Sequence, residues 1–238
     1  DTILQAFKNE IGIYEFQNYK LVYRHVLDLA CALKNFGIKR GDLVGLISDN
    51  RREWLITDLA LLSLGAADVP RGCDSMGTEI RFILNFTSCK VWFFENERQL
   101  TKVLENIEEV PELRDVILFD SPSELTMERA ALQGIRVHKF IDFEDIGRHS
   151  TDKQRSEIEA EIDKTDGSDV ATIIFTSGTT GTPKGVMLTH DNFICQCEVI
   201  KDVLTNAKEG DMWLSVLPVW HIMEREFGYF IISLKCGI

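Results

Sequence analysis

Hydrophobic residues in the first part of the chain alternate between two spacings. From residue 21 to residue 36 they recur every three or four positions, which is the period of an amphipathic helix. Gly37 follows, where a left-handed C-terminal cap is expected. Residues 43–47 then form a continuous apolar run, typical of a parallel strand that is covered on both faces. The pattern predicts a helix followed by a buried strand.

The same alternation continues to residue 119. We predict that Asn50 and Ser75 cap two further helices, and that a third helix covers about residues 97–107. Because short apolar strands separated by helices imply crossover connections, the sheet is expected to be mostly parallel. The fold class is therefore α/β, with mostly parallel sheets flanked by helices. The remaining predicted strands of this part lie at 66–70, 91–94 and 116–119.

The pattern is weaker between residues 121 and 168. Residues 136–140 fit a strand, and the charge-rich residues 152–164 fit a surface helix with one thin apolar stripe. We therefore divide the chain into a first α/β portion at 1–120, a connecting region at 121–168 and a last portion at 169–238.

The last portion opens with two apolar runs, 170–175 and 186–188, that flank a stretch rich in glycine and hydroxyl side chains. A helix is predicted to begin at Asp191 or Asn192. A further strand is predicted over residues 211–217, because apolar residues dominate that stretch until a proline ends it.

The stretch between the two apolar runs has the composition of a phosphate-binding loop. Glycines let the backbone approach an anion closely, successive amides can converge on phosphate oxygens, and hydroxyl groups add donors or a Mg²⁺ ligand. Lys184 adds a compact positive charge. A flexible surface hairpin is the alternative, although such linkers rarely end in Pro-Lys-Gly between apolar strands. The loop residues are Thr176, Ser177, Gly178, Thr179, Thr180, Gly181, Thr182, Pro183, Lys184 and Gly185.

A Walker loop uses similar residues at a different spacing. It requires a glycine, four residues and then Gly-Lys-Ser/Thr at the start of a helix. Here Pro183 stands five residues after Gly178, Lys184 is followed by Gly185, and the next run has a β pattern. The spacing therefore excludes the Walker arrangement.

With these residues, the stretch from Thr172 to His190 resembles the phosphate-binding signature of the adenylate-forming, or AMP-binding, superfamily. Residues 37–54, 93–120 and 217–225 resemble the long-chain fatty acyl-CoA synthetases within that superfamily. The likeness covers nearly the whole chain. It implies that residues 1–238 are part of the large N-terminal AMP-binding domain and that the C-terminal domain is absent.

The resemblance also implies a reaction. An ATP-dependent ligase of this kind joins a fatty acid to ATP as an acyl-adenylate and then passes the acyl group to CoA. Residues 176–182 and Lys184 are implied to hold the phosphates of ATP, and Thr176 is implied to be a ligand of Mg²⁺. Lys184 is implied to be a catalytic clamp on phosphate charge, and His221 a catalytic group at the acyl carboxylate. For His221, a core histidine that bonds the backbone is the alternative.

Other parts of the family pattern lie outside these 238 residues, among them the adenine and ribose sites and the C-terminal lysine. We therefore expect this stretch alone not to adenylate a substrate. Two other readings stay open: an adenylating enzyme for a different carboxylate, and a non-catalytic nucleotide-binding module. Glu224 and Arg225 match the acidic–basic pair that follows the histidine in that family, which implies a structural ion pair near the pocket or, alternatively, a catalytic role.

Composition limits the kinds of partner and the cellular compartment that we expect for the protein. With 38 acidic and 26 basic side chains the formal charge is −12, which repels polyphosphate, so nucleic acid is not an expected partner. The six cysteines form no CxxC pair and are expected to be free thiols in a reducing cytosol. No apolar run approaches the roughly 20 residues that span a bilayer, and no secretory signal is recognised. We expect a cytoplasmic protein; peripheral association with a membrane stays open.

Overall fold

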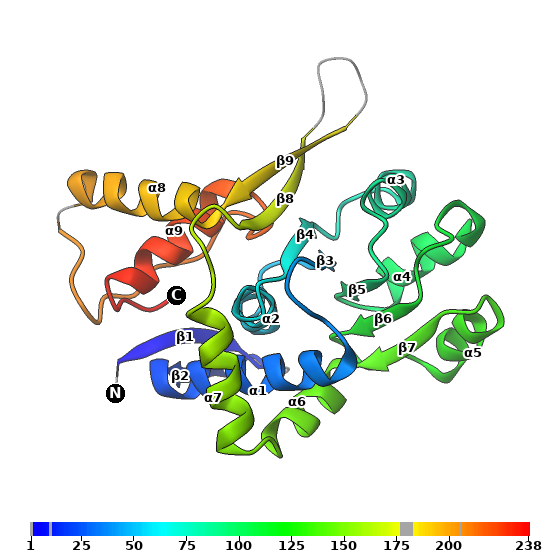
Figure 1. The fold of residues 1–238 in the computed structure, drawn as a ribbon, viewed down its shortest axis with the longest axis horizontal. Coiled ribbons are helices and arrows are strands. Elements are labelled where there is room, and N and C mark those ends of the chain that lie inside the picture. The colour runs from blue at the N-terminus through cyan, green and yellow to red at the C-terminus, as the bar shows by residue number, and fades with distance from the viewer. Residues whose placement is uncertain (1, 10, 177–182, 205) are drawn as a thin grey trace.

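Within residues 2–9, 11–176, 183–204 and 206–238, which the computed structural model describes, seven strands form one sheet (Figure 1). Their order is β7-β6-β5-β3-β4-β8-β9. The first six are mutually parallel and β9 runs antiparallel to β8, so the predicted α/β class and mostly parallel sheet are confirmed. The strands are β3 (Leu43–Ile47), β4 (Ala67–Arg71), β5 (Val91–Phe94), β6 (Asp115–Leu118), β7 (Arg136–Lys139), β8 (Val170–Thr176) and β9 (Lys184–Thr189).

Helices cover both faces of this sheet (Figure 1). Alternate residues of β3 and β5 point to opposite faces, as the two-residue period of a strand requires. Leu46 and Phe93 pack in the cluster with α1, α2, α6 and α7, whereas Ile47 and Phe94 pack in the cluster with α3 and α4. The helices are α1 (Tyr19–Phe36), α2 (Arg52–Ser63), α3 (Gly77–Thr87), α4 (Glu97–Leu104), α5 (Glu124–Leu132), α6 (Phe140–Arg148), α7 (Asp152–Ile162), α8 (His190–Val203) and α9 (Ile222–Ser233), with a short 3₁₀ turn at Ile107–Glu109.

The observed helix ends agree only in part with the caps predicted from the sequence. Gly37 ends α1 in the left-handed conformation with φ of 114°, as predicted. The caps predicted at Asn50 and Ser75 are wrong, because α2 follows Arg51 and α3 follows Met76. Helix α8 begins one residue before Asp191, after its cap, Thr189.

The connecting region contains more structure than its sequence pattern predicted. Strand β7 and helix α7 confirm the two predicted elements, while α5 and α6 are additional helices. Helix α7 is mainly a surface helix, but Arg155 is buried and its Nε donates to Asp28 Oδ1 of α1 at 2.6 Å. That pair fixes α7 against α1.

The strand predicted at residues 211–217 is wrong. Met212 forms a single parallel bridge with Gly237, and the rest of the segment has no strand pairing within the described residues. Most of its side chains are exposed, among them Leu214 and Val216. The apolar residues that suggested a strand therefore do not belong to the central sheet.

The two ends of the chain lie beside each other. Strands β1 (Ile3–Lys8) and β2 (Tyr14–Asn18) form a separate antiparallel pair that the sequence did not predict. Ile238 donates its amide to Leu4 O at 2.7 Å and accepts from Ala6 N at 2.8 Å. Helices α8 and α9 form a small third core around Phe230 and Ile231 (Figure 1).

Candidate nucleotide site

The predicted phosphate-binding loop joins β8 to β9, which project together from the body of the molecule (Figure 1). Buried residues of β8 lead to the exposed Thr176, and the chain returns at Lys184. Thr176 and Lys184 are partners in the antiparallel register, so their backbones lie directly opposite each other. The prediction that a strand follows the loop is confirmed. Ser177, Gly178, Thr179, Thr180, Gly181 and Thr182 lie outside the described residues.

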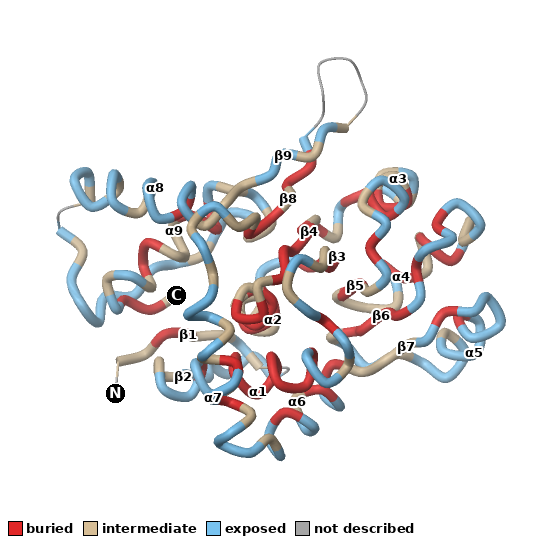
Figure 2. The backbone as a smooth tube through the Cα atoms, viewed as in Figure 1, coloured by how far each residue is buried: buried red, intermediate tan, exposed pale blue. Residues whose placement is uncertain are grey.

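The base of this loop offers two kinds of polar group. The Lys184 side chain carries an ammonium group with three donors, and the Thr176 hydroxyl is a hard oxygen of the kind that Mg²⁺ prefers. Both residues are exposed, whereas the β8 residues behind them are buried (Figure 2). Mg²⁺ usually keeps several waters and binds substrate phosphates alongside one or two protein oxygens, so Thr176 fits one position of such a site.

His221 is exposed, so the alternative of a core histidine is wrong. It is the N-cap of α9, where its Nδ1 accepts a hydrogen bond from Met223 N at 3.3 Å. Because Nδ1 accepts, a neutral imidazole carries its proton on Nε2, which leaves that atom as a donor. A group exposed at a helix N-terminus is also close to the positive end of the helix dipole.

Asn50 holds the segment that leads to His221. Its Nδ2 donates to Leu217 O at 2.7 Å and to Ser215 Oγ at 2.8 Å, and its Oδ1 accepts from Val219 N at 3.0 Å. From the other side, Glu224 Oε2 accepts from Leu217 N at 3.2 Å. The prediction of Asn50 as a helix cap missed this role. Its partners are about 170 positions away, and no local pattern indicates them.

Glu224 and Arg225 do not pair with each other, which corrects the prediction. Arg225 is buried, and its two outer nitrogens lie 2.5 Å from Asp58 Oδ1 of α2 and 3.0 Å from Asp68 Oδ1 of β4. Tyr229 also donates to Asp58 at 2.6 Å. These contacts join α9 to α2 and to the sheet, so Arg225 has a structural role.

Two carboxylates around one guanidinium leave this buried cluster short of positive charge. Burial raises the pKa of Asp58 to about 7, with Arg225 opposing the shift and the charge of Asp68 adding to it. Burial also raises the pKa of Tyr229 well above its usual range, so its hydroxyl remains a donor. The cluster is therefore sensitive to pH.

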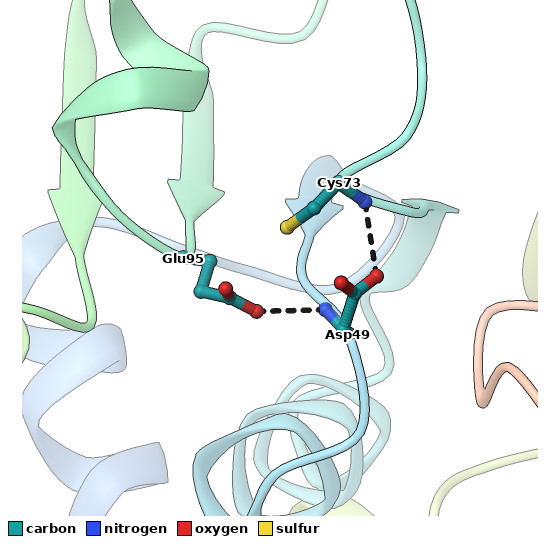
Figure 3. Close-up of side chains that lie close together, drawn as sticks. All are labelled: Asp49, Cys73 and Glu95. Carbon is teal, nitrogen blue, oxygen red and sulfur yellow. Dashed lines mark hydrogen bonds between the residues drawn. The ribbon is translucent and has the colours of Figure 1, made fainter. Parts of the chain in front are cut away.

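A second polar cluster lies where three parallel strands end. Asp49, Cys73 and Glu95 follow β3, β4 and β5, and one ligand atom of each lies within 4.8 Å of the others (Figure 3). Glu95 Oε2 accepts from Asp49 N at 2.9 Å, and Asp49 Oδ1 accepts from Cys73 N at 3.1 Å. Burial raises the pKa of Cys73 to about 12, and the neighbouring Glu95 and Asp49 carboxylates add to the shift. Through these two hydrogen bonds, the Glu95 and Asp49 carboxylates connect the three loops that follow the strands.

A cavity lies beside the segment that leads to His221. It has a volume of about 1020 Å³ and lies between β1, the start of α2, residues 212–215 and α9. Phe7, Trp54, Trp213 and Tyr229 are among its lining residues, whereas Lys184 and His221 are not. Glu224 and Arg225, which the sequence singled out, also line this cavity.

These observations define the class of the protein. Residues 4–238 match the AMP-binding enzyme family, and the chain belongs to that family. Long-chain-fatty-acid–CoA ligases are among its relatives, as the sequence analysis expected.

Individual relatives are identical to the chain at about a third of the aligned positions. It is 32% identical over 227 residues to the chloroplastic long-chain-fatty-acid–acyl-carrier-protein ligase AEE15 of Arabidopsis thaliana, covering 92% of this chain and 30% of that protein. It is 30% identical over 220 residues to human long-chain-fatty-acid–CoA ligase 1, covering 89% of this chain and 30% of that protein. The chain thus spans about 30% of the length of these relatives.

Solved structures agree on the fold. The A-PCP didomain of the carboxylic acid reductase from Segniliparus rugosus, solved in complex with AMP, superposes with a TM-score of 0.77 at 19% identity. It covers all of this chain, which corresponds to 36% of that chain. The long-chain-fatty-acid–CoA ligase FadD1 of Archaeoglobus fulgidus gives a TM-score of 0.71 at 19% identity, covering all of this chain and 43% of that one.

Among the helices of the described residues, none combines the length and the apolar character that crossing a bilayer demands. All six cysteines are free, as predicted, and three of them are buried: Cys31, Cys89 and Cys236.

Proposed function

We propose that the protein containing this chain activates a fatty acid with ATP and transfers the acyl group to CoA. The observation that carries the proposal is the hairpin of β8 and β9, in which Thr176 and Lys184 face each other at the base of a glycine- and hydroxyl-rich loop. Membership of the AMP-binding enzyme family supports it.

In the first step a carboxylate oxygen of the fatty acid attacks the α-phosphorus of ATP. A bond forms between that oxygen and phosphorus, the bond to the bridging oxygen breaks, and pyrophosphate leaves. Catalysis of such a step rests mainly on positioning and on stabilising phosphate charge. We assign the β- and γ-phosphates to residues 176–182 and to Lys184, whose ammonium attracts the charge that develops on pyrophosphate. Mg²⁺, when bound, supplies further neutralisation, with Thr176 as one ligand.

We assign the acyl carboxylate to His221. Its exposed imidazole carries a donor at Nε2 while Nδ1 is held by the start of α9, so the ring is oriented by the helix that it caps. A hydrogen bond from Nε2 would orient the carboxylate for attack. In the second step the CoA thiol forms a thioester with the acyl carbon, and AMP leaves with the bonding electrons.

Pyrophosphate exchange tests the first step. The complete protein, given palmitate, ATP, Mg²⁺ and labelled pyrophosphate, is expected to return label to ATP, and residues 1–238 alone are expected not to do so. A series of carboxylates of increasing chain length separates a fatty acid from another carboxylate as substrate. Absence of exchange with every carboxylate would favour the non-catalytic nucleotide-binding module.

The thiol acceptor is a separate question, because the Arabidopsis relative is named as a ligase for acyl carrier protein. Supplying the complete protein with preformed acyl-adenylate and either CoA or an acyl carrier protein distinguishes the two. We expect thioester with CoA; product with the carrier protein alone would replace CoA as the acceptor.

A further inference from the structure

Arg71 lies between the two separate parts of the proposed site. It is the last residue of β4, and its Nη1 donates to Phe175 O at 3.2 Å, one residue before Thr176. Its guanidinium carbon lies 5.2 Å from the centre of the Trp220 ring, one residue before His221. A single side chain thus contacts the base of the loop and the turn that carries His221.

Gly72 lets the indole of Trp220 approach the same place. A Cβ on Gly72 would lie 2.2 Å from Trp220 Nε1, which no real contact allows. The indole therefore rests against the backbone at residues 71–72 as well as on the guanidinium of Arg71. Both contacts fix Trp220 and, through the chain, the position of His221.

The backbone around Arg71 is itself anchored. Lys102 Nζ donates to Cys73 O and to Ser75 O, both at 2.8 Å, and Asp49 Oδ1 accepts from Cys73 N (Figure 3). Arg71 also forms an ion pair with Glu79 of α3, which balances its charge. An arginine whose charge is already balanced suits the holding of other groups better than the binding of phosphate.

We propose that Arg71 is a positioning residue that couples the loop base at Thr176 and Lys184 to the turn at Trp220 and His221. Only arginine has a planar, always charged group that can donate to a carbonyl, pair with a carboxylate and stack on an indole at once. Binding of a pyrophosphate group at the loop base then alters the surroundings of Trp220. This inference rests on the proposed function.

Tryptophan fluorescence can test the coupling in the folded chain. Trp54 and Trp92 are buried, so in a Trp213→Phe background acrylamide quenching reports on Trp220. Magnesium pyrophosphate is a suitable probe because it does not absorb in the indole band, and calorimetry measures its binding independently. In the Trp213→Phe background we expect binding to shift the Trp220 emission.

Three variants separate coupling from binding. Arg71→Gln should raise the quenching of Trp220 by about twofold and abolish the emission response, because it removes the stacked cation. Arg71→Lys keeps a cation but cannot contact the Phe175 carbonyl and the Glu79 carboxylate together. Protection of Trp220 from acrylamide should therefore persist, while the emission response to pyrophosphate is lost. Gly72→Ala should displace the indole and abolish the response with pyrophosphate affinity kept within about twofold of the parent.

The matched control is Arg136→Gln, which removes an arginine–carboxylate pair at β7, away from the loop, and should leave the response unchanged. If the parent binds pyrophosphate and Arg71→Gln responds as the parent does, the coupling is refuted and the proposed function stands. If the parent binds pyrophosphate and the Trp220 emission does not change, the coupling is likewise refuted and the proposed function stands. If calorimetry detects no binding to the parent, the coupling is refuted, whereas the proposed function is judged by pyrophosphate exchange in the complete protein.

Discussion

At the scale of single residues, the buried cluster of Arg225, Asp58 and Asp68 places two carboxyl groups around one guanidinium. The family resemblance implied an ion pair of Arg225 with Glu224, but the structure pairs Arg225 with a carboxylate 167 positions away. Burial makes such long-range pairs necessary, since an unpaired charge in the core costs several kcal/mol. No local pattern could reveal this partner.

The raised pKa of Asp58 makes a prediction about stability. Because the folded-state pKa is about 7 and lies above the usual value, folding favours the protonated form. The stabilisation from this group is full below about pH 4 and is lost as the pH rises through about 7. In Asp58→Asn this dependence disappears, so the free energy of unfolding of the parent should fall relative to that of the variant by about 4 kcal/mol from about pH 4 to about pH 8.

Urea unfolding at several pH values measures this gap. Asp202→Asn, at an exposed position of α8, is the matched control and should run parallel to the parent. Parallel curves for Asp58→Asn and the parent would show that Asp58 does not titrate in this range.

At the scale of elements, the parallel strands were predictable and the segment 211–217 was not. Strands β3 and β5 are continuous apolar runs, β6 is apolar after Asp115, and their burial on both faces produces that pattern. Residues 211–217 are also largely apolar, yet polar side chains of other elements hold their backbone instead of a neighbouring strand. Pattern alone cannot decide whether a partner strand exists.

Asn50 holds residues 215–219 through hydrogen bonds of its side chain, so its removal should destabilise that segment. Asn50→Ala removes three hydrogen bonds to residues 215–219 and should lower the free energy of unfolding by about 1–2 kcal/mol. Hydrogen exchange should speed up at the amide of Val219. The exposed Asn85→Ala on α3 serves as the control for asparagine removal. Unchanged exchange at Val219 would mean that Asn50 does not hold this segment.

At the scale of the whole molecule, the fold places the proposed catalytic groups around one end of the sheet. Strands β4 and β8 are parallel neighbours, and the residues at their carboxyl ends, Arg71 and Thr176, adjoin each other through Phe175. Open parallel sheets commonly bind ligands at this end. The sequence predicted the loop because its chemistry is local, but it missed Arg71, whose contacts exist only in the folded chain.

The proposed function requires that Lys184 and the loop that it ends hold the phosphates of ATP. Calorimetric titration of MgATP into the folded chain tests it directly, with Lys184→Ala compared against Lys201→Ala, a lysine of α8 that pairs with Glu198. We expect Lys184→Ala to weaken MgATP binding by about 10–100-fold, as for a lost charge-assisted bond, and Lys201→Ala to bind as the parent does. Equal affinity of Lys184→Ala and the parent would contradict this expectation.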